Sequence, residues 1–482
     1  MATEADARRL VDILASELGT RAGLVTRNSN YYRGKHPLRF ASREFREYFA
    51  EQYAGFSDNW VQPVSDSPVE RLTVVGIQAA GEITADSELW QVWQRNGLDA
   101  DSQLGFLGAV TSARCHVLVW GDPKNPDLPV VTFEDASSSI VAYEPGSRRR
   151  RRAALKMWQD GMCEYATLYL PHEVWKFERP LGPGPKKSPQ MAEADEALEA
   201  WEPREVENEP NPQPNPLGVV PMVELPNRPL LAEDPISDVS GVIAMQDAIN
   251  LLWAQLFTAA DFASLAQRIV IGAEVPKMPI LDANGQKVGE KPIDLKKFAK
   301  DRVLWLENPN AKVDSWPAAN LTAYTEVITV AVGHIAAQTR TPQHYLIGKM
   351  ANLSGDALLA AETGLVMKAK EKQLWFGQAL REVFQLIALA KGERAKADAV
   401  AGGMVLWADA ETRSIAALTD SLLKLKQVGF PFEFLARRFG LTPTEVSDLM
   451  AMREREAAAD PVSALLAGKP GLAPPPAPVP AG

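Results

Sequence analysis

The sequence predicts an α+β protein, and three observations lead to that prediction. Short β-branched runs bounded by Gly, Pro or Asp crowd between residues 115 and 177, which is typical of an antiparallel sheet built from hairpins. Three long stretches with apolar residues at helical spacing follow, at about 236–271, 320–338 and 354–390. The 482 residues are 46% hydrophobic, so the chain can bury large cores, and a prior of about 150 residues per domain suggests about three domains.

Composition and charge exclude several classes of protein. Lys and Arg number 51 against 61 Asp and Glu, and the net charge of −10 is not that of a protein that grips nucleic acid tightly. Cys115 and Cys163 cannot form a disulfide framework, which fits a reducing compartment. The first residues lack the basic and apolar regions of a secretory signal. Charged residues interrupt the most apolar run, 242–271, so we expect no membrane span.

The N-terminal half should combine helices with the sheet. We expect helices over 4–18, around 45–53, over 86–94 and around 104–107, and a strand over 72–77 ended by Gly76. The hairpin strands are expected at 115–120, 130–133, 140–143, 153–158, 166–170 and 174–177. Residues 181–216 are rich in Pro and acidic residues and should form a mobile linker. A turn at 215–220 then feeds a buried strand.

The C-terminal half should be mainly helical. Between the first two long helices lies an insert, 272–317, with a turn at Asn284-Gly285 and a strand over 303–306. Asn320 caps the second helix and Ser354 the third, in which Gly364 or Gly377 could mark a bend. A strand over 404–407 precedes helices at 414–428, 431–439 and from 442 onward. The Pro/Ala-rich end of the chain cannot pack a core.

Motifs for enzymatic chemistry are missing. Gly348-Lys349 is followed by Met350, so no phosphate-cradling loop is present, and the histidines have no metal-ligand spacing. We therefore expect no enzyme, no metal and no cofactor. Asp127 and Glu134 are faintly similar to a nuclease metal site, although Ala136 stands where such a site needs lysine. A nucleic-acid-processing hydrolase with its site near these two carboxylates is the alternative function.

Two basic clusters have two interpretations each. Arg148 to Arg152 form either a solvated hairpin that discourages strand aggregation or a patch that faces phosphates or acidic groups. Lys296, Lys297, Lys300 and Arg302 form either a solvated helix face or a surface on which a partner docks.

An ordered series of sequence blocks carries a resemblance to a known family. The central block is a helix end, a polar aromatic stretch and a Ser-Gly helix start, from Ile335 to Leu358. The chain resembles the portal proteins of long-tailed double-stranded DNA phages, in which the matching stretch is a loop lining the DNA channel. Further blocks agree and follow in the expected order: 31–38, 59–60, 70–72, 93–99, 215–221 and 246–250.

The resemblance implies a portal fold with an α/β wing, a two-helix stem, a small α/β clip, a tunnel loop, a long bent helix and a helical crown. The implied parts are the wing (1–235, with the 181–216 linker), first stem helix (236–271), clip (272–317), second stem helix (318–340), tunnel loop (341–353), long bent helix of the wing (354–402), crown (403–456) and a disordered Pro/Ala-rich tail (457–482). Such proteins form rings of about twelve subunits at one capsid vertex of the virion, assembled in the host cytoplasm.

The resemblance also implies partners and site residues. The partners are sibling subunits, the large terminase, a head–tail adaptor, the major capsid or scaffold protein, and double-stranded DNA that passes without sequence-specific binding. Because each Lys or Arg contact to phosphate adds affinity, a channel for sliding DNA should be acidic or neutral with few basic rings. The candidates for these basic rings are Arg268, Arg340 and Lys349, with ordinary interfacial ion pairs as the alternative. The side chains expected to approach DNA are Gln343, His344, Tyr345 and Asn352, with capping and packing between subunits as the alternative. Candidate docking residues of the clip are Lys296, Lys297, Lys300 and Arg302.

Overall fold

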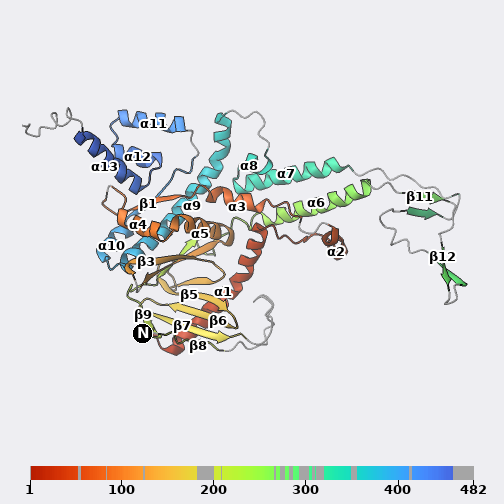
Figure 1. Cartoon of the computed structure of the whole chain (residues 1–482), viewed down its shortest axis with the longest axis horizontal. Coiled ribbons are helices and arrows are strands. Elements are labelled where there is room, and N and C mark those ends of the chain that lie inside the picture. Colours follow the sequence, from red (N-terminus) through yellow and green to blue (C-terminus); the bar gives the residue numbers. More distant parts are fainter. Residues whose placement is uncertain are drawn as a thin grey trace, which may run out of the picture.

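The computed structural model of the chain describes residues 2–52, 56–82, 84–122, 125–181, 200–207, 209–264, 268–271, 277–281, 286–292, 303–306, 310, 320–348, 355–411 and 415–459. Helices and strands are mixed throughout, which confirms the α+β class (Figure 1). The helices are α1 (Glu4–Tyr32), α2 (Arg43–Gln52), α3 (Val61–Val69), α4 (Ser87–Arg95), α5 (Leu98–Ser112), α6 (Ile243–Ser264), α7 (Leu321–Thr339), α8 (Gln343–Ile347), α9 (Gly355–Ala390), α10 (Arg394–Ala401), α11 (Ile415–Gln427), α12 (Phe432–Phe439) and α13 (Pro443–Ala459).

The strands form two larger sheets and three pairs. They are β1 (Val74–Gln78), β2 (Arg114–Asp122), β3 (Asn125–Glu134), β4 (Ser139–Tyr143), β5 (Arg151–Asp160), β6 (Cys163–Tyr169), β7 (Glu173–Pro180), β8 (Glu202–Pro203), β9 (Gln213–Pro214), β10 (Met222–Pro226), β11 (Arg268–Ile271), β12 (Lys277–Leu281), β13 (Lys287–Pro292), β14 (Val303–Leu306) and β15 (Met404–Trp407). The hairpin strands thus divide into a sheet β10-β2-β3 and a sheet β4-β5-β6-β7-β8, rather than the single sheet expected.

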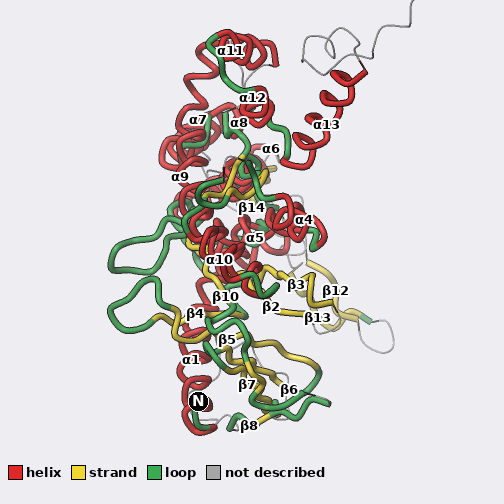
Figure 2. The backbone as a smooth tube through the Cα atoms, turned by 90° about the vertical axis from the view of Figure 1, so that its left-hand side faces the viewer, coloured by secondary structure: helices red, strands yellow, loops and turns green. Residues whose placement is uncertain are grey.

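Helix α1 covers the larger sheet. Its stripe Ala7, Val11, Leu14 and Leu18 packs with apolar residues of β4 to β7. The helix continues to Tyr32 instead of ending near residue 18, because Val25 and Tyr31 extend the same buried face. Figure 2 shows α1 running along the strands of this lower part of the molecule.

The prediction of a mobile linker over 181–216 is wrong for the second half of that range. Glu202–Pro203 and Gln213–Pro214 both pair with β7, and the indole of Trp201 is buried in the core beneath α1. Residues 182–199 lie outside the described part of the chain.

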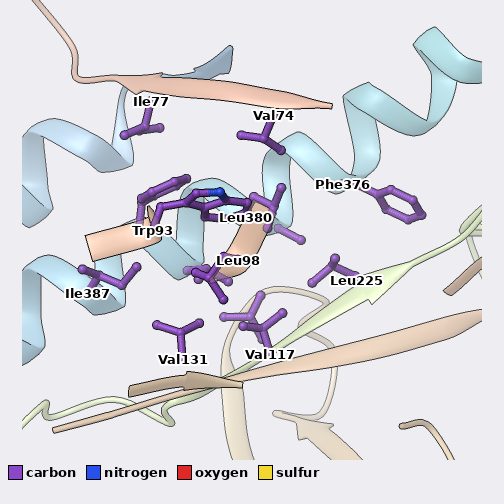
Figure 3. Close-up of a cluster of buried hydrophobic side chains, with 14 of the residues drawn as sticks. Val74, Ile77, Trp93, Leu98, Val117, Val131, Leu225, Phe376, Leu380 and Ile387 are labelled. Carbon is purple, nitrogen blue, oxygen red and sulfur yellow. The ribbon is translucent and has the colours of Figure 1, made fainter. Parts of the chain in front are cut away.

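The central core lies between the three-stranded sheet and the β1–β15 pair. Figure 3 shows Val74 and Ile77 of β1 on one side and Val117, Val131 and Leu225 on the other. Trp93 of α4, Leu98 of α5 and three residues of α9 (Phe376, Leu380 and Ile387) fill the space between them. Strand β1 passes through Gly76 with a register shift rather than ending there. The C-terminal half of α9, from Phe376 onward, therefore lies at the centre of this core.

Helices α6 and α7 lie side by side and extend away from this body toward β11 to β14 (Figure 1). Val239, Val242 and Ile249 pack with Ile328, Val332 and Ile335 at the base of the pair. The side chain of Asn320 caps α7 as predicted. The expected helix over 236–271 is too long at both ends, because turns precede Ile243 and Arg268–Ile271 is a strand paired in parallel with β14.

Helices α11 to α13 lie at the other end of the molecule from β11 and β12 (Figure 1). They begin near the predicted positions, and Thr442 and Glu445 form reciprocal capping bonds at the start of α13. The expected tail from residue 457 begins too early, since α13 runs to Ala459. The predicted turn at Asn284-Gly285 and the cap Ser354 lie outside the described residues.

Candidate functional site

Most of the candidate residues lie in the stretch between the end of α7 and the start of α9. We call residues 340–348 the bridging segment. Arg340 ends α7 in the left-handed region at φ +56°, and Gly348 ends α8 in the same region at φ +66°. Between them the predicted loop contains the short helix α8, which begins directly after Pro342. Pro342 precedes the helix with an extended backbone (φ −57°, ψ 135°), and Tyr345 N donates to its carbonyl at 3.0 Å in the first turn.

Carboxylates of α9 hold the bridging segment in place. Arg340 Nη2 donates to Glu371 Oε2 at 2.8 Å, with both side chains about 40% exposed. The hydroxyl of Tyr345 lies 3.4 Å from Glu362 Oε1, nine residues earlier along the same helix. His344 Nε2 lies 3.9 Å from that oxygen, and its ring is tilted against the ring of Tyr345.

Arg71, just after α3, completes this contact set. Its guanidinium donates to Tyr345 Oη at 3.0 Å, to Glu362 Oε2 at 3.2 Å and to the carbonyl of Ala410 at 2.7 Å. The Arg71 and Glu362 side chains are only 10% and 13% exposed. A charged pair this sheltered from water is screened less than a surface pair. Arg71 therefore connects the bridging segment, α9 and the chain leading to α11.

Sequence reasoning located part of this arrangement. The structure brings Arg340, His344 and Tyr345 together along α9, whereas Gln343 is exposed at the start of α8. Lys349 and Asn352 lie outside the described residues, as do Lys296, Lys297, Lys300 and Arg302; of Arg268 only the backbone is described. Sequence reasoning missed Arg71, Glu362 and Glu371 as partners, although the block Glu70-Arg71-Leu72 had been singled out.

A buried charge cluster fixes α9 against the start of α6. The Asp238 carboxylate lies 2.9 Å from Lys368 Nζ and 3.0 Å from Lys372 Nζ, and it accepts a hydrogen bond from Asn227. All three charged side chains are at most 5% exposed. Burial disfavours the charged carboxylate, but the two ammonium groups outweigh burial and lower the pKa of Asp238. Burial, followed by the charge of Lys368, lowers the pKa of Lys372 to about 8.

The alternative site at Asp127 and Glu134 is contradicted by the geometry of β3. The two residues lie seven positions apart on one continuous strand, which separates them by about 23 Å. Ligands of one metal ion must lie within about 2–2.5 Å of it. Glu134 is instead paired with Lys156 Nζ at 2.6 Å and accepts from Thr132. Among the described residues no group of His, Cys, Asp and Glu is arranged to hold a metal.

Most of the chain is similar to known proteins of one family. Residues 14–439 match the family described as "Phage portal protein, SPP1 Gp6-like". The portal protein of Mycobacterium phage D29 is 27% identical over 408 residues, which cover 82% of this chain and 78% of the relative. The portal protein of Mycobacterium phage L5 is 27% identical over 442 residues, covering 86% and 84% respectively. In the part of the chain that the structure describes, no helix combines the length and apolarity needed to cross a bilayer.

Proposed function

The chain belongs to the SPP1 Gp6-like family of phage portal proteins, and we propose that it closes into a ring at one capsid vertex through which double-stranded DNA enters and leaves. The observation that carries this proposal is the family match over residues 14–439. Proteins of this family are structural components of the phage capsid. The ring would be closed by head-to-tail contacts, each subunit presenting two different surfaces to its neighbours.

The fold can be divided in the way this function needs. We assign residues 1–235 to the wing, α6 and α7 to the stem, 272–317 to the clip, and 403–456 to the crown, with α9 as the long helix of the wing. The projection of paired helices α6 and α7 away from the body supports this division, because a stem must separate the clip from the wing (Figure 1).

The bridging segment is our candidate for the tunnel loop. Gln343 and Tyr345 are exposed on it and are the described side chains best able to approach DNA, with Lys349 and Asn352 expected next to them. The ion pair between Arg340 and Glu371 reduces the positive charge that Arg340 can offer to phosphates. Together with the net charge of −10, this neutralisation fits a wall along which DNA slides.

Docking to partners is assigned to the opposite end of the stem. Lys296, Lys297, Lys300 and Arg302 of the clip are the candidates for binding the large terminase and a head–tail adaptor, while the wing and crown would face the capsid or scaffold protein. Triple replacement of Lys296, Lys297 and Lys300 by Glu should weaken pull-down of both partners, and unchanged pull-down would remove this assignment.

Two measurements test the conduit. Electron microscopy of the purified protein should show rings with a central hole, and a protein that stays monomeric at high concentration would contradict the proposal. Deletion of residues 343–352 should leave these rings intact but impair DNA packaging or retention, because the segment is assigned to the channel wall. Subunits that no longer associate after the deletion would identify it as an interface element.

A further inference from the structure

Two loops of the wing together form a protruding surface with unusual chemistry. We call it the arginine knob: the β4–β5 turn, 144–150, and the loop 228–234 after β10. Arg148, Arg149 and Arg150 are all exposed on the turn. The neighbouring loop exposes Leu231 to 88% of its area. Arginine is enriched in protein interfaces, and Leu231 adds exposed apolar area to the same surface.

The knob is held in a defined shape. The turn closes with Glu144 N donating to the carbonyl of Arg150, and Gly146 supplies the left-handed conformation at φ +77°. Arg148 Nη2 donates to the carbonyl of Leu230 at 2.9 Å, which joins the two loops. Arg114 in turn holds Asp234 at 2.6 Å. A preorganised surface loses little conformational freedom on binding.

A surface of opposite character lies at the other end of the same strands. We call it the acidic face: Trp158, Asp160, Met162, Tyr165, Glu202 and Glu205. The rings of Trp158 and Tyr165 stack at 5.6 Å, and Met162 is 61% exposed beside them in sequence. Arg204 lies 4.9 Å from the centre of the Tyr165 ring and 5.6 Å from that of Trp158, so the chain segment that carries the exposed Glu202 and Glu205 runs past these rings.

The sheet topology sets the two surfaces apart. Strand β5 begins next to the knob at Arg151 and ends in the acidic face at Asp160, so its ten residues span about 33 Å. Strands β5 and β7 both run antiparallel to β6, and Glu202 pairs with Glu178 near the far end of β7. The knob and the acidic face therefore lie at opposite ends of one sheet, and one surface cannot reach the other within a single subunit.

We propose that the arginine knob of one subunit docks on the acidic face of the next copy of this chain. Arg150 is paired with Glu144 within its own turn, so Arg148 and Arg149 are the cations offered to the carboxylates of the acidic face. The apolar contents also match, with leucine on one surface and aromatic rings and methionine on the other. Two different patches at opposite ends of one subunit give a head-to-tail contact, which closes a ring when the rotation between copies allows it. This inference rests on the proposed ring and names the surfaces that would build it.

Paired charge reversals provide the test. Variant A carries Arg148→Glu, Arg149→Glu and Arg150→Glu, and variant B carries Asp160→Lys, Glu202→Lys and Glu205→Lys. Each alone places like charges across every contact, so the protein concentration that gives half assembly should rise about tenfold or more. An equimolar mixture of A and B should assemble again. In a ring in which A and B alternate, the acidic knob of A meets the basic face of B, and the basic knob of B meets the acidic face of A. Native mass spectrometry would identify both chains in the same ring.

Controls separate this inference from the proposed function. A matched reversal of Lys426, Arg438 and Arg455 to Glu, on α11 to α13, changes the charge by the same amount as variant A and should leave assembly unchanged. Thermal melting of A and B should stay close to that of the wild type, since the substituted side chains are exposed and A loses only the Arg148 bond to the Leu230 carbonyl and the exposed Arg150–Glu144 pair. Normal assembly of A and B, or no rescue in the mixture, would overturn the inference while leaving the ring itself standing. If A assembles but no longer retains DNA in filter binding, the arginines face phosphates instead. A wild-type protein that forms no ring would remove the proposed function as well.

Discussion

Arg71 donates a hydrogen bond to the hydroxyl of Tyr345 although 274 positions separate them in the chain. The same guanidinium pairs with Glu362 on α9. The residue after α3, the bridging segment and α9 therefore meet at the Arg71 guanidinium. If the bridging segment lines the DNA channel, its position depends on the packing of the wing beneath it. The structure therefore couples the wall of the proposed channel to the body of the subunit.

Replacing Arg71 with Gln should loosen the bridging segment. The substitution leaves Glu362, which is 13% exposed, without its cationic partner, and this should cost about 2–3 kcal/mol locally. Hydrogen exchange of a peptide covering 341–348 should become faster. Arg43→Gln is the matched control, because the Arg43–Glu47 pair is largely exposed and worth about 1 kcal/mol or less. Equal exchange in the Arg71 variant and the wild type would show that α9 holds the segment without Arg71.

Asp238→Asn should strongly destabilise the protein. Lys368 and Lys372 would remain buried without a counter-charge, and breaking a buried pair costs about 3–5 kcal/mol. Urea unfolding measures the loss, with Asp420→Asn as the control, since Asp420 forms an exposed pair with Lys424. A loss below 1 kcal/mol in the Asp238 variant would mean that the lysines release their protons or reach water.

His116 should make the fold sensitive to acid. Its ring is 1% exposed and lies 2.8 Å from Ser139 Oγ; burial, followed by the charges of Arg114 and Arg21, lowers its pKa to about 3. The unfolded state, with a pKa near 6.5, then binds a proton between pH 6.5 and 3 that the folded state does not, so stability falls as the pH falls through this range. His116→Gln should reduce that slope by about 1.4 kcal/mol per pH unit. Unfolding free energies measured at several pH values test the slope, and an unchanged slope in the His116 variant would contradict this prediction.

Two glycines of α5 should respond oppositely to alanine. A Cβ at Gly105 would lie 2.1 Å from Cδ1 of Phe133, so Gly105→Ala should cost about 1–3 kcal/mol despite its better helix propensity. The nearest atom to a Cβ at Gly108 is 4.0 Å away, so Gly108→Ala should stabilise by up to about 1 kcal/mol. Thermal melting compares the two, and Phe133→Leu should partly restore the Gly105 variant. A stabilising effect of Gly105→Ala would show that the Phe133 ring on β3 moves freely out of the way.

Local patterns predicted most of the helices and hairpin strands. Asn320 caps its helix as predicted, and apolar spacing located α7 and α9. The pattern was wrong where a partner decides the structure. The apolar pattern at 268–271 predicted a continuation of the preceding helix, but this segment is a strand that pairs with β14. The proline-rich stretch around Trp201 was predicted to be a linker, but it pairs with β7.

The candidate site could be predicted only as a stretch of chain. Spacing around Pro342 indicated a polar connection between two helices, and the structure adds that Tyr345 meets Arg71 and Glu362 there. Arg71 lies 274 positions from Tyr345 and 291 from Glu362, and a single sequence carries no local signal for such contacts. The division of the strands into two sheets could not be predicted for the same reason, because β10 pairs with β2 across about a hundred residues.

The pairing of β1 with β15 has a consequence for biosynthesis. Strand β1 is complete at Gln78, but its partner begins only at Met404, so a ribosome working at about 5–20 residues per second needs roughly 15–65 s to supply it. During that interval the apolar side of β1 and the hydrophobic face awaiting α9 stay uncovered on the nascent chain. Chaperone demand in the host should therefore peak before translation ends, and early termination should yield aggregates rather than smaller folded products.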